Sequence, residues 1–121
     1  MSIINLEYTD IFDEQKVKKL TFSKHLIKSD FKEKSLFAII VNGESMQPII
    51  NDKAVLVTDL SNKMLEDEKI YLVYYENKMW VKKYSLENKN FYSINPKFSH
   101  LLYKDDEVQV VAKVLITFTN L

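Results

Sequence analysis

A serine follows the only glycine of the chain, at a point where an apolar segment ends. The segment reads Val-Asn-Gly-Glu-Ser-Met-Gln-Pro, with Gly43 two residues before Ser45 and Pro48 three residues after it. Glycine lets a chain turn sharply after a strand, so the Ser45 hydroxyl and nearby backbone N–H groups can project into one cleft. These residues predict a serine nucleophile with oxyanion donors in the same turn, although a plain β-turn with a hydrogen-bonded serine fits them as well.

A serine hydroxyl needs a base, and lysine is the candidate base in this sequence. A lysine amine accepts a proton near pH 7 only when burial disfavours its ammonium form. Lys82 and Lys83 interrupt the apolar run Met79–Tyr84 and must point to opposite faces of a strand. Lys82 shares its face with two large aromatic residues, which favours Lys82, while either lysine stem could also reach water.

Other kinds of catalytic or cofactor site find little support. We expect His25 and His100 to be surface residues, because neither has a second His, a Cys or an acidic cluster at metal-ligand spacing. A single glycine excludes glycine-rich phosphate loops and dinucleotide fingerprints. The absence of cysteine excludes disulfides and thiolate metal clusters and fits a reducing cytoplasm. The sequence therefore predicts neither a metal nor a cofactor.

Length and charge favour one compact domain, and the N-terminal sequence favours a location in the cytoplasm. A chain of 121 residues is long enough for one real core and short for two. The 17 basic and 17 acidic side chains cancel, which argues against binding nucleic acid or an anionic membrane through bulk charge. No apolar run reaches the length of a membrane span, and the N-terminus lacks the pattern of a signal peptide.

The elements that would position the serine and the lysine are mostly strands. Six short segments are rich in β-branched and aromatic residues: 36–41, 54–58, 69–75, 79–84, 91–94 and 108–118. Asn77-Lys78 is expected to close a tight hairpin. The last strand alternates, with Val111 and Leu115 on a half-polar face that could be a partner surface or lie beneath another strand. Residues 10–28 carry the one helical pattern, which predicts a short helix or turn followed by a loop.

Several motifs, taken in order, resemble the self-cleaving peptidases of the LexA-like group, which includes the UmuD-type proteins and lambda-type phage repressors. Gly43–Pro48 is similar to their Gly-x-Ser-Met-x-Pro nucleophile turn, and residues 80–84 resemble the strand that carries their catalytic lysine, which falls on Lys82. Residues 93–98 resemble their Asn-Pro turn, residues 110–115 their closing strand, and residues 22–41 their lead-in region. The resemblance covers residues 20 to 118.

This resemblance implies a fold and a set of roles. The fold would be mainly β, a compact LexA-like peptidase fold of short, strongly bent strands with at most one short N-terminal helix. Residues 1–20 would be left from a linker and cleavage region, and residues 21–121 would form the peptidase and dimerisation domain. Ser45 would be the nucleophile and Lys82 its general base, with the turn backbone at Gly43, Glu44, Met46 and Pro48 shaping the site and holding the oxyanion.

The same resemblance implies partners. The domain would regulate a transcriptional repressor of the phage or SOS type, form a homodimer, and respond to a RecA-type or antirepressor co-regulator. It would reach DNA only through a separate N-terminal helix-turn-helix domain absent from this chain, and it would have no membrane partner.

Two departures keep a second reading open. The sequence has no Ala-Gly bond, which is the usual self-cleavage site, and residues 51–53 read Asn-Asp-Lys where relatives carry Asp-Gly-Asp. The domain could therefore be a dimerisation or partner-sensing module in which catalysis is vestigial. A bacterial signal peptidase uses a similar Ser-Met turn and lysine, but the membrane anchor of such an enzyme is missing here.

Overall fold

The computed structural model describes residues 2–120, and strands dominate this part of the chain. The elements are β1 (Ile3–Asp10), β2 (Lys16–Ser23), η1 (Lys24–Leu26), η2 (Glu33–Ser35), β3 (Leu36–Ile40), β4 (Val55–Asp59), β5 (Ile70–Tyr75), β6 (Lys78–Ser85), β7 (Asn90–Tyr92), η3 (Pro96–Phe98), β8 (Tyr103–Lys104) and β9 (Gln109–Phe118). Each η element is a single 3₁₀ turn. The expectation of a mainly β fold is confirmed, and all six expected strands form within a residue or two of their predicted bounds.

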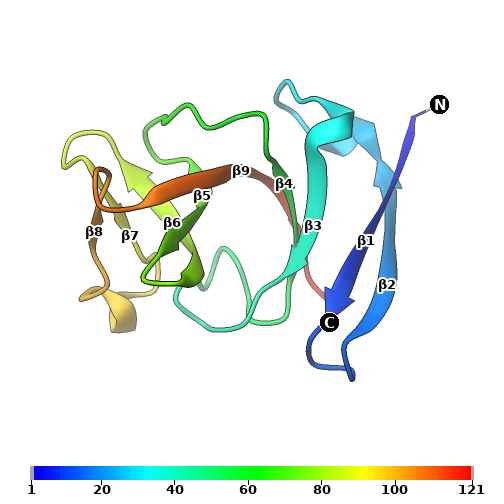
Figure 1. Cartoon of the computed structure of the whole chain (residues 1–121), viewed down its shortest axis with the longest axis horizontal. Helices are drawn as coiled ribbons and strands as arrows, with labels where there is room; N and C mark the ends of the chain where they lie inside the picture. Colours follow the sequence, from blue (N-terminus) through cyan, green and yellow to red (C-terminus); the bar gives the residue numbers. More distant parts are fainter. Residues whose placement is uncertain (1, 121) are drawn as a thin grey trace.

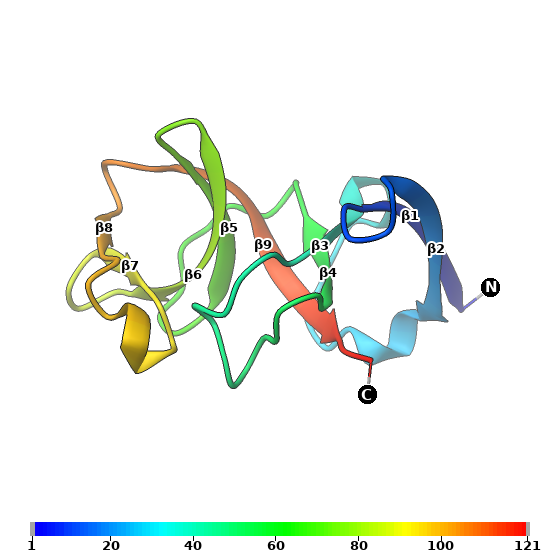
Figure 2. The ribbon, with the colours of Figure 1, turned by 90° about the horizontal axis from the view of Figure 1, so that it is seen from below.

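A seven-stranded antiparallel sheet with the order β3-β4-β9-β5-β6-β7-β8 carries most of the structure. Strand β9 crosses the molecule and joins β4 to β5, with the β1–β2 hairpin at one end and β7 and β8 at the other (Figures 1 and 2). Because β9 pairs at one end with β4 and at the other with β5, strands β3 and β4, which flank the Ser45 turn, belong to the same sheet as β6, which carries Lys82.

The strict alternation expected along β9 is wrong. The pairing register shifts between Val57 and Thr58 on β4 and between Leu72 and Val73 on β5, so β9 has an extra residue at each shift. Such bulges bend a strand and re-aim its side chains. Leu115, expected on the half-polar face, packs against a core cluster, and nearby Lys113 is buried and paired with Glu66 at 2.7 Å.

The helical pattern expected within residues 10–28 is also wrong, because Lys16–Ser23 form strand β2 and the helical part is the single 3₁₀ turn Lys24–Leu26. Strands β1 and β2 form a separate two-stranded sheet that packs beside β3, as Figures 1 and 2 show. Alternate side chains of β2 turn inward, ending at the buried Phe22, which a period of two explains and a helix does not. Residues 1–20 as a linker remnant stay a prediction.

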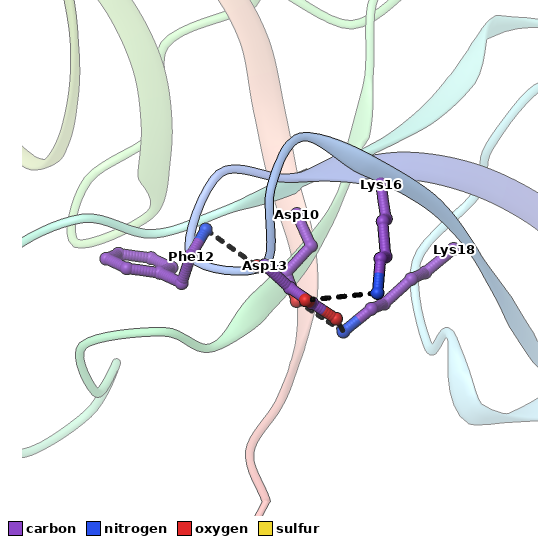
Figure 3. Close-up of polar contacts among 5 residues, drawn as sticks. All are labelled: Asp10, Phe12, Asp13, Lys16 and Lys18. Atoms are coloured by element: carbon purple, nitrogen blue, oxygen red, sulfur yellow. Dashed lines mark hydrogen bonds and ion pairs between the residues drawn. The ribbon is translucent and has the colours of Figure 1, made fainter.

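An ionic cluster holds the turn of this hairpin. Lys18 Nζ lies 2.7 Å from an Asp10 carboxylate oxygen and 2.9 Å from one of Asp13, and the Phe12 N–H donates to Asp10 at 2.9 Å (Figure 3). The hydrogen bond from Lys18 is the main reason why the pKa of Asp10 is lowered. The Lys53 ammonium lies over the Phe12 ring, 5.2 Å from its centroid, and ties the turn to the body of the domain.

Scarcity of glycine forces other residues into left-handed turns. Seven non-glycine residues between positions 2 and 120 have positive φ, among them Glu76 and Asn77 (φ 49° and 64°), which form the β5–β6 hairpin turn. The hairpin is therefore confirmed with its turn one residue earlier than predicted, because Lys78 already begins β6. Lys53 (φ 68°) lies in the turn at residues 51–53, which therefore takes up a left-handed conformation without glycine.

In the described part of the chain, the core beneath the serine turn is one of three buried clusters. It consists of Met46, Ile50, Ala54 and Leu56, and side chains from β3, β5, β6 and β9 pack around these residues. This packing fixes the position of the turn relative to β6, which carries Lys82.

Candidate active site at the Ser45 turn

The chain leaves β3 and turns sharply at Gly43. The backbone there has a φ of +130°, a conformation that residues with a Cβ rarely adopt. A Cβ added at Gly43 would meet no atom within 4 Å, so backbone conformation rather than space demands glycine. The Gly43 N–H donates to Asp52 Oδ1 at 2.8 Å, which holds the start of the turn.

The side chain after the serine anchors the turn in the core. Met46 is 2% exposed and packs in the cluster described above. The Gln47 N–H donates to the Glu44 carbonyl at 3.1 Å, and the Ile50 N–H donates to the Met46 carbonyl at 2.9 Å. The Gln47–Pro48 peptide is cis, and Pro48 itself is exposed. With Met46 fixed inward, Ser45 is left half-buried at the surface of the turn.

Lys82 meets Ser45 from the middle of β6. Strand β6 pairs with β5, and Lys82 stands opposite Tyr71 in that register. The Lys82 side chain is 0% exposed, and its Nζ lies 2.9 Å from Ser45 Oγ, a contact between residues 37 positions apart. Lys83 faces the other side of the sheet and is half-buried. Strand alternation and the neighbouring aromatic residues favoured Lys82 without excluding Lys83, and in the folded sheet Lys82 is the more deeply buried of the two.

Burial changes the acid–base character of Lys82. Desolvation lowers the pKa of its amine from 10.5 to about 8, because the charged form loses hydration that the apolar surroundings do not replace. Among the described residues no carboxylate pairs with Lys82. The Trp80 ring lies on the same face of β6, with its centroid 5.4 Å from Nζ. Lys82 is therefore an amine that can be neutral near physiological pH and stands within hydrogen-bond distance of a hydroxyl.

A cleft of about 440 Å³ opens beside Ser45. Glu44, on the serine turn, is its one ionisable lining residue, and most of the wall is apolar. The lining side chains come from the end of β3, the serine turn, β5, β6 and the segment after β7: Ile39, Ile40, Val41, Asn42, Gly43, Glu44, Ser45, Met46, Leu72, Met79, Trp80, Val81, Phe98 and Leu101. Such a cleft suits an extended peptide with apolar side chains better than a charged small molecule.

The structure brings the residues predicted for the site close together, and four of them line the cleft: Gly43, Glu44, Ser45 and Met46. Lys82 is not part of the lining but contacts Ser45 from beneath the turn, and Pro48 also lies outside the lining. Both histidines are exposed, as expected. Within residues 2–120 no group of three or more His, Cys, Asp or Glu side chains is arranged to hold a metal ion.

Sequence reasoning missed two side chains that contact the serine turn. Asp52 accepts from Gly43, and Asn95 donates to the Glu44 carbonyl from a loop 51 residues away in the sequence. The sequence offered one indication for Asn95: it precedes Pro96, and an Asn-Pro pair marks a turn. Such a pair does not predict which part of the protein the turn contacts.

Of the helices in residues 2–120, none is long and apolar enough to cross a membrane.

Comparison with known proteins gives one relative and one family. An uncharacterized HTH-type transcriptional regulator of Haemophilus influenzae is 41% identical over 46 residues, which is 38% of this chain and 19% of the relative. The match thus spans about a fifth of that regulator. The family model described as Peptidase S24-like matches residues 4–115, nearly the whole chain. The chain therefore belongs to the Peptidase S24-like family.

Proposed function

We propose that the chain is the regulatory peptidase domain of a transcriptional repressor, with Ser45 as nucleophile and Lys82 as general base. One observation carries this proposal: a fully buried lysine amine lies 2.9 Å from the hydroxyl of a serine in a strained, glycine-dependent turn. Family membership supports the peptidase class. The name of the matched regulator supports a repressor that binds DNA through a separate helix-turn-helix domain.

The geometry supports a two-step acyl transfer. Neutral Lys82 takes the proton from Ser45 Oγ as the oxygen attacks a peptide carbonyl, and the new ammonium then protonates the leaving amine. A water molecule then attacks the resulting ester while Lys82 accepts a proton from it. The acyl group leaves as a carboxylic acid, and the Lys82 ammonium returns the proton to Ser45 Oγ. Backbone N–H groups of the serine turn would stabilise the oxyanion in both steps.

The substrate class follows from the cleft. An extended peptide could lie between the end of β3 and β6, with apolar side chains against Trp80, Val81 and Leu72. We propose that the peptide comes from the same polypeptide, since a tethered segment reaches the cleft at high effective concentration. In the same proposal the domain acts in the cytoplasm as a homodimer and responds to a RecA-type or antirepressor co-regulator.

A second candidate keeps the fold without the reaction. The absence of an Ala-Gly bond in this sequence favours a dimerisation or partner-sensing module in which catalysis is vestigial. In such a module Lys82 would still hydrogen-bond to Ser45, and the cleft would bind a peptide without cutting it.

Incubation at alkaline pH separates the two candidates. The protein at its natural length would be kept at pH 9 to 10 as wild type, Ser45→Ala and Lys82→Ala, and its fragments identified by mass spectrometry. Cleavage at one bond in the wild type alone supports the peptidase. Intact protein in all three supports the vestigial module, and equal fragmentation in all three assigns the cleavage to a contaminating protease.

A further inference from the structure

Asn95 is bonded to the peptide groups on both sides of the nucleophile. Its side-chain Nδ2 donates to the Glu44 carbonyl at 3.0 Å, and its backbone N–H donates to the Ser45 carbonyl at 2.9 Å. Its Oδ1 accepts from the Lys97 N–H at 3.1 Å, which caps η3 and fixes the side-chain rotamer. Three hydrogen bonds thus connect η3, through one residue, to a turn 50 positions earlier in the chain.

Holding these two carbonyls also orients the serine N–H. A trans peptide group is planar, with its N–H and C=O pointing in opposite directions. Because the Glu44 carbonyl points at Asn95, the Ser45 N–H of the same peptide group points away from Asn95. Within residues 2–120 that N–H donates no hydrogen bond to the protein, so it is available to a reacting carbonyl oxygen.

We propose that Asn95 is a positioning residue for the reaction at Ser45. It holds the nucleophile turn so that the hydroxyl stays beside Lys82 and the Ser45 N–H stays directed at the developing oxyanion. Asp52 holds the start of the same turn through Gly43, and Asn95 holds its centre, so the turn is restrained before any peptide enters. This inference rests on the proposed function, because a positioning role requires a reaction at Ser45.

The substitution Asn95→Asp is the informative variant. It removes the Nδ2–H donor and places a carboxylate oxygen against the Glu44 carbonyl, while it keeps an acceptor for the Lys97 N–H. The matched control is Ser99→Asp, which adds the same charge at an exposed position at the end of η3 without contacting the serine turn.

Reaction with a fluorophosphonate probe measures the role. The probe forms a bond from Ser45 Oγ to phosphorus, fluoride leaves, and Lys82 takes the serine proton. For Asn95→Asp we expect the maximal rate of inactivation to fall about tenfold or more, with the half-saturating probe concentration within twofold of wild type. Ser99→Asp should react at the wild-type rate. Reaction of Asn95→Asp at the control rate would overturn the inference.

Amide exchange tests the restraint independently of reactivity. The Gln47 N–H donates to the same Glu44 carbonyl, so its hydrogen exchange should quicken in Asn95→Asp and not in Ser99→Asp. Unchanged exchange would also overturn the inference. If amide exchange is faster in Asn95→Asp but the wild-type protein does not react with the probe, the restraint by Asn95 is supported and the proposed function is overturned. Failure of the inference and failure of the proposed function are therefore distinguishable.

Discussion

A methionine in place of Lys82 should stabilise the protein while it removes the candidate base. Lys82 is 0% exposed, and its pKa is lowered from 10.5 to about 8 by desolvation. At about 1.4 kcal/mol per pH unit, the 2.5-unit difference corresponds to about 3 kcal/mol lost by keeping a buried ammonium at pH 7. Solvent screening at the cleft and loss of the hydrogen bond to Ser45 reduce the gain from Lys82→Met to about 1 to 2 kcal/mol.

The effect of Lys82→Met on the free energy of unfolding should depend on pH. Below pH 8 both states of the wild type carry the lysine proton, so the folded state bears the full cost of the buried charge. Between about pH 8 and pH 10.5 the unfolded state keeps a proton that the folded state has released, so wild-type stability rises with pH. The advantage of Lys82→Met should therefore be largest at pH 7 and shrink by pH 10.

Urea unfolding followed by circular dichroism at pH 7 and pH 10 measures the effect. A gain of 1 to 2 kcal/mol corresponds to about 4 to 8 °C in melting temperature for a domain of this size. The matched control is Lys83→Met, because Lys83 is the next residue, lies on the opposite face and is only half-buried. Destabilisation by Lys82→Met, or an advantage over Lys83→Met that is the same at both pH values, would refute the reasoning.

Three further predictions concern the hairpin turns and the cleft. Glu76→Asn should raise the free energy of unfolding by up to about 1 kcal/mol, because asparagine tolerates the positive φ at this position better than glutamate; urea unfolding measures it, and an equal gain from Glu87→Asn, an exposed acid without positive φ, would contradict it. Asp10→Asn should weaken the contact with Lys18 and speed amide exchange in the β1–β2 turn, whereas unchanged exchange would show that the ionic cluster does not hold the turn. Trp80→Ala should admit water to Lys82 and move the midpoint of the pH–rate profile above 8, and an unmoved midpoint would show that Trp80 does not shield the amine.

Local patterns predicted the central strands because each has a short β-branched or aromatic run bounded by turn residues. The same reasoning failed at β2, where lysines separate the inward-facing residues and the period of two is visible only beside β1. It failed again along β9, because the bulges arise from pairing one strand with two neighbours of different register. Both errors arise because the pairing of a strand with its neighbours cannot be seen in the sequence of that strand alone.

The sequence predicted those residues of the candidate site that lie in a single turn and a single strand. Gly43 and Ser45 lie two residues apart in one short turn, and the resemblance selected Lys82 over Lys83. Composition could not show that Lys82 would be buried without a carboxylate partner, since burial depends on how β6 packs over the Ser45 turn. Asn95 lay beyond local reasoning, because its contacts reach 50 and 51 residues back along the chain.

The most direct test of the account is the reaction of Ser45 with a fluorophosphonate probe as a function of pH. Intact-mass and peptide mass spectrometry would follow a single adduct in the wild type, Ser45→Ala and Lys82→Met. With a pKa of about 8 for Lys82, the neutral fraction is about 0.01 at pH 6 and about 0.9 at pH 9, so the rate should rise roughly 90-fold over that range and then level off. An adduct on Ser45 that follows this profile in the wild type, and is lost in both variants, is the predicted result. A folded wild type that does not react, or reaction in Lys82→Met at the wild-type rate, would contradict the assignment of Ser45 and Lys82 as a catalytic pair.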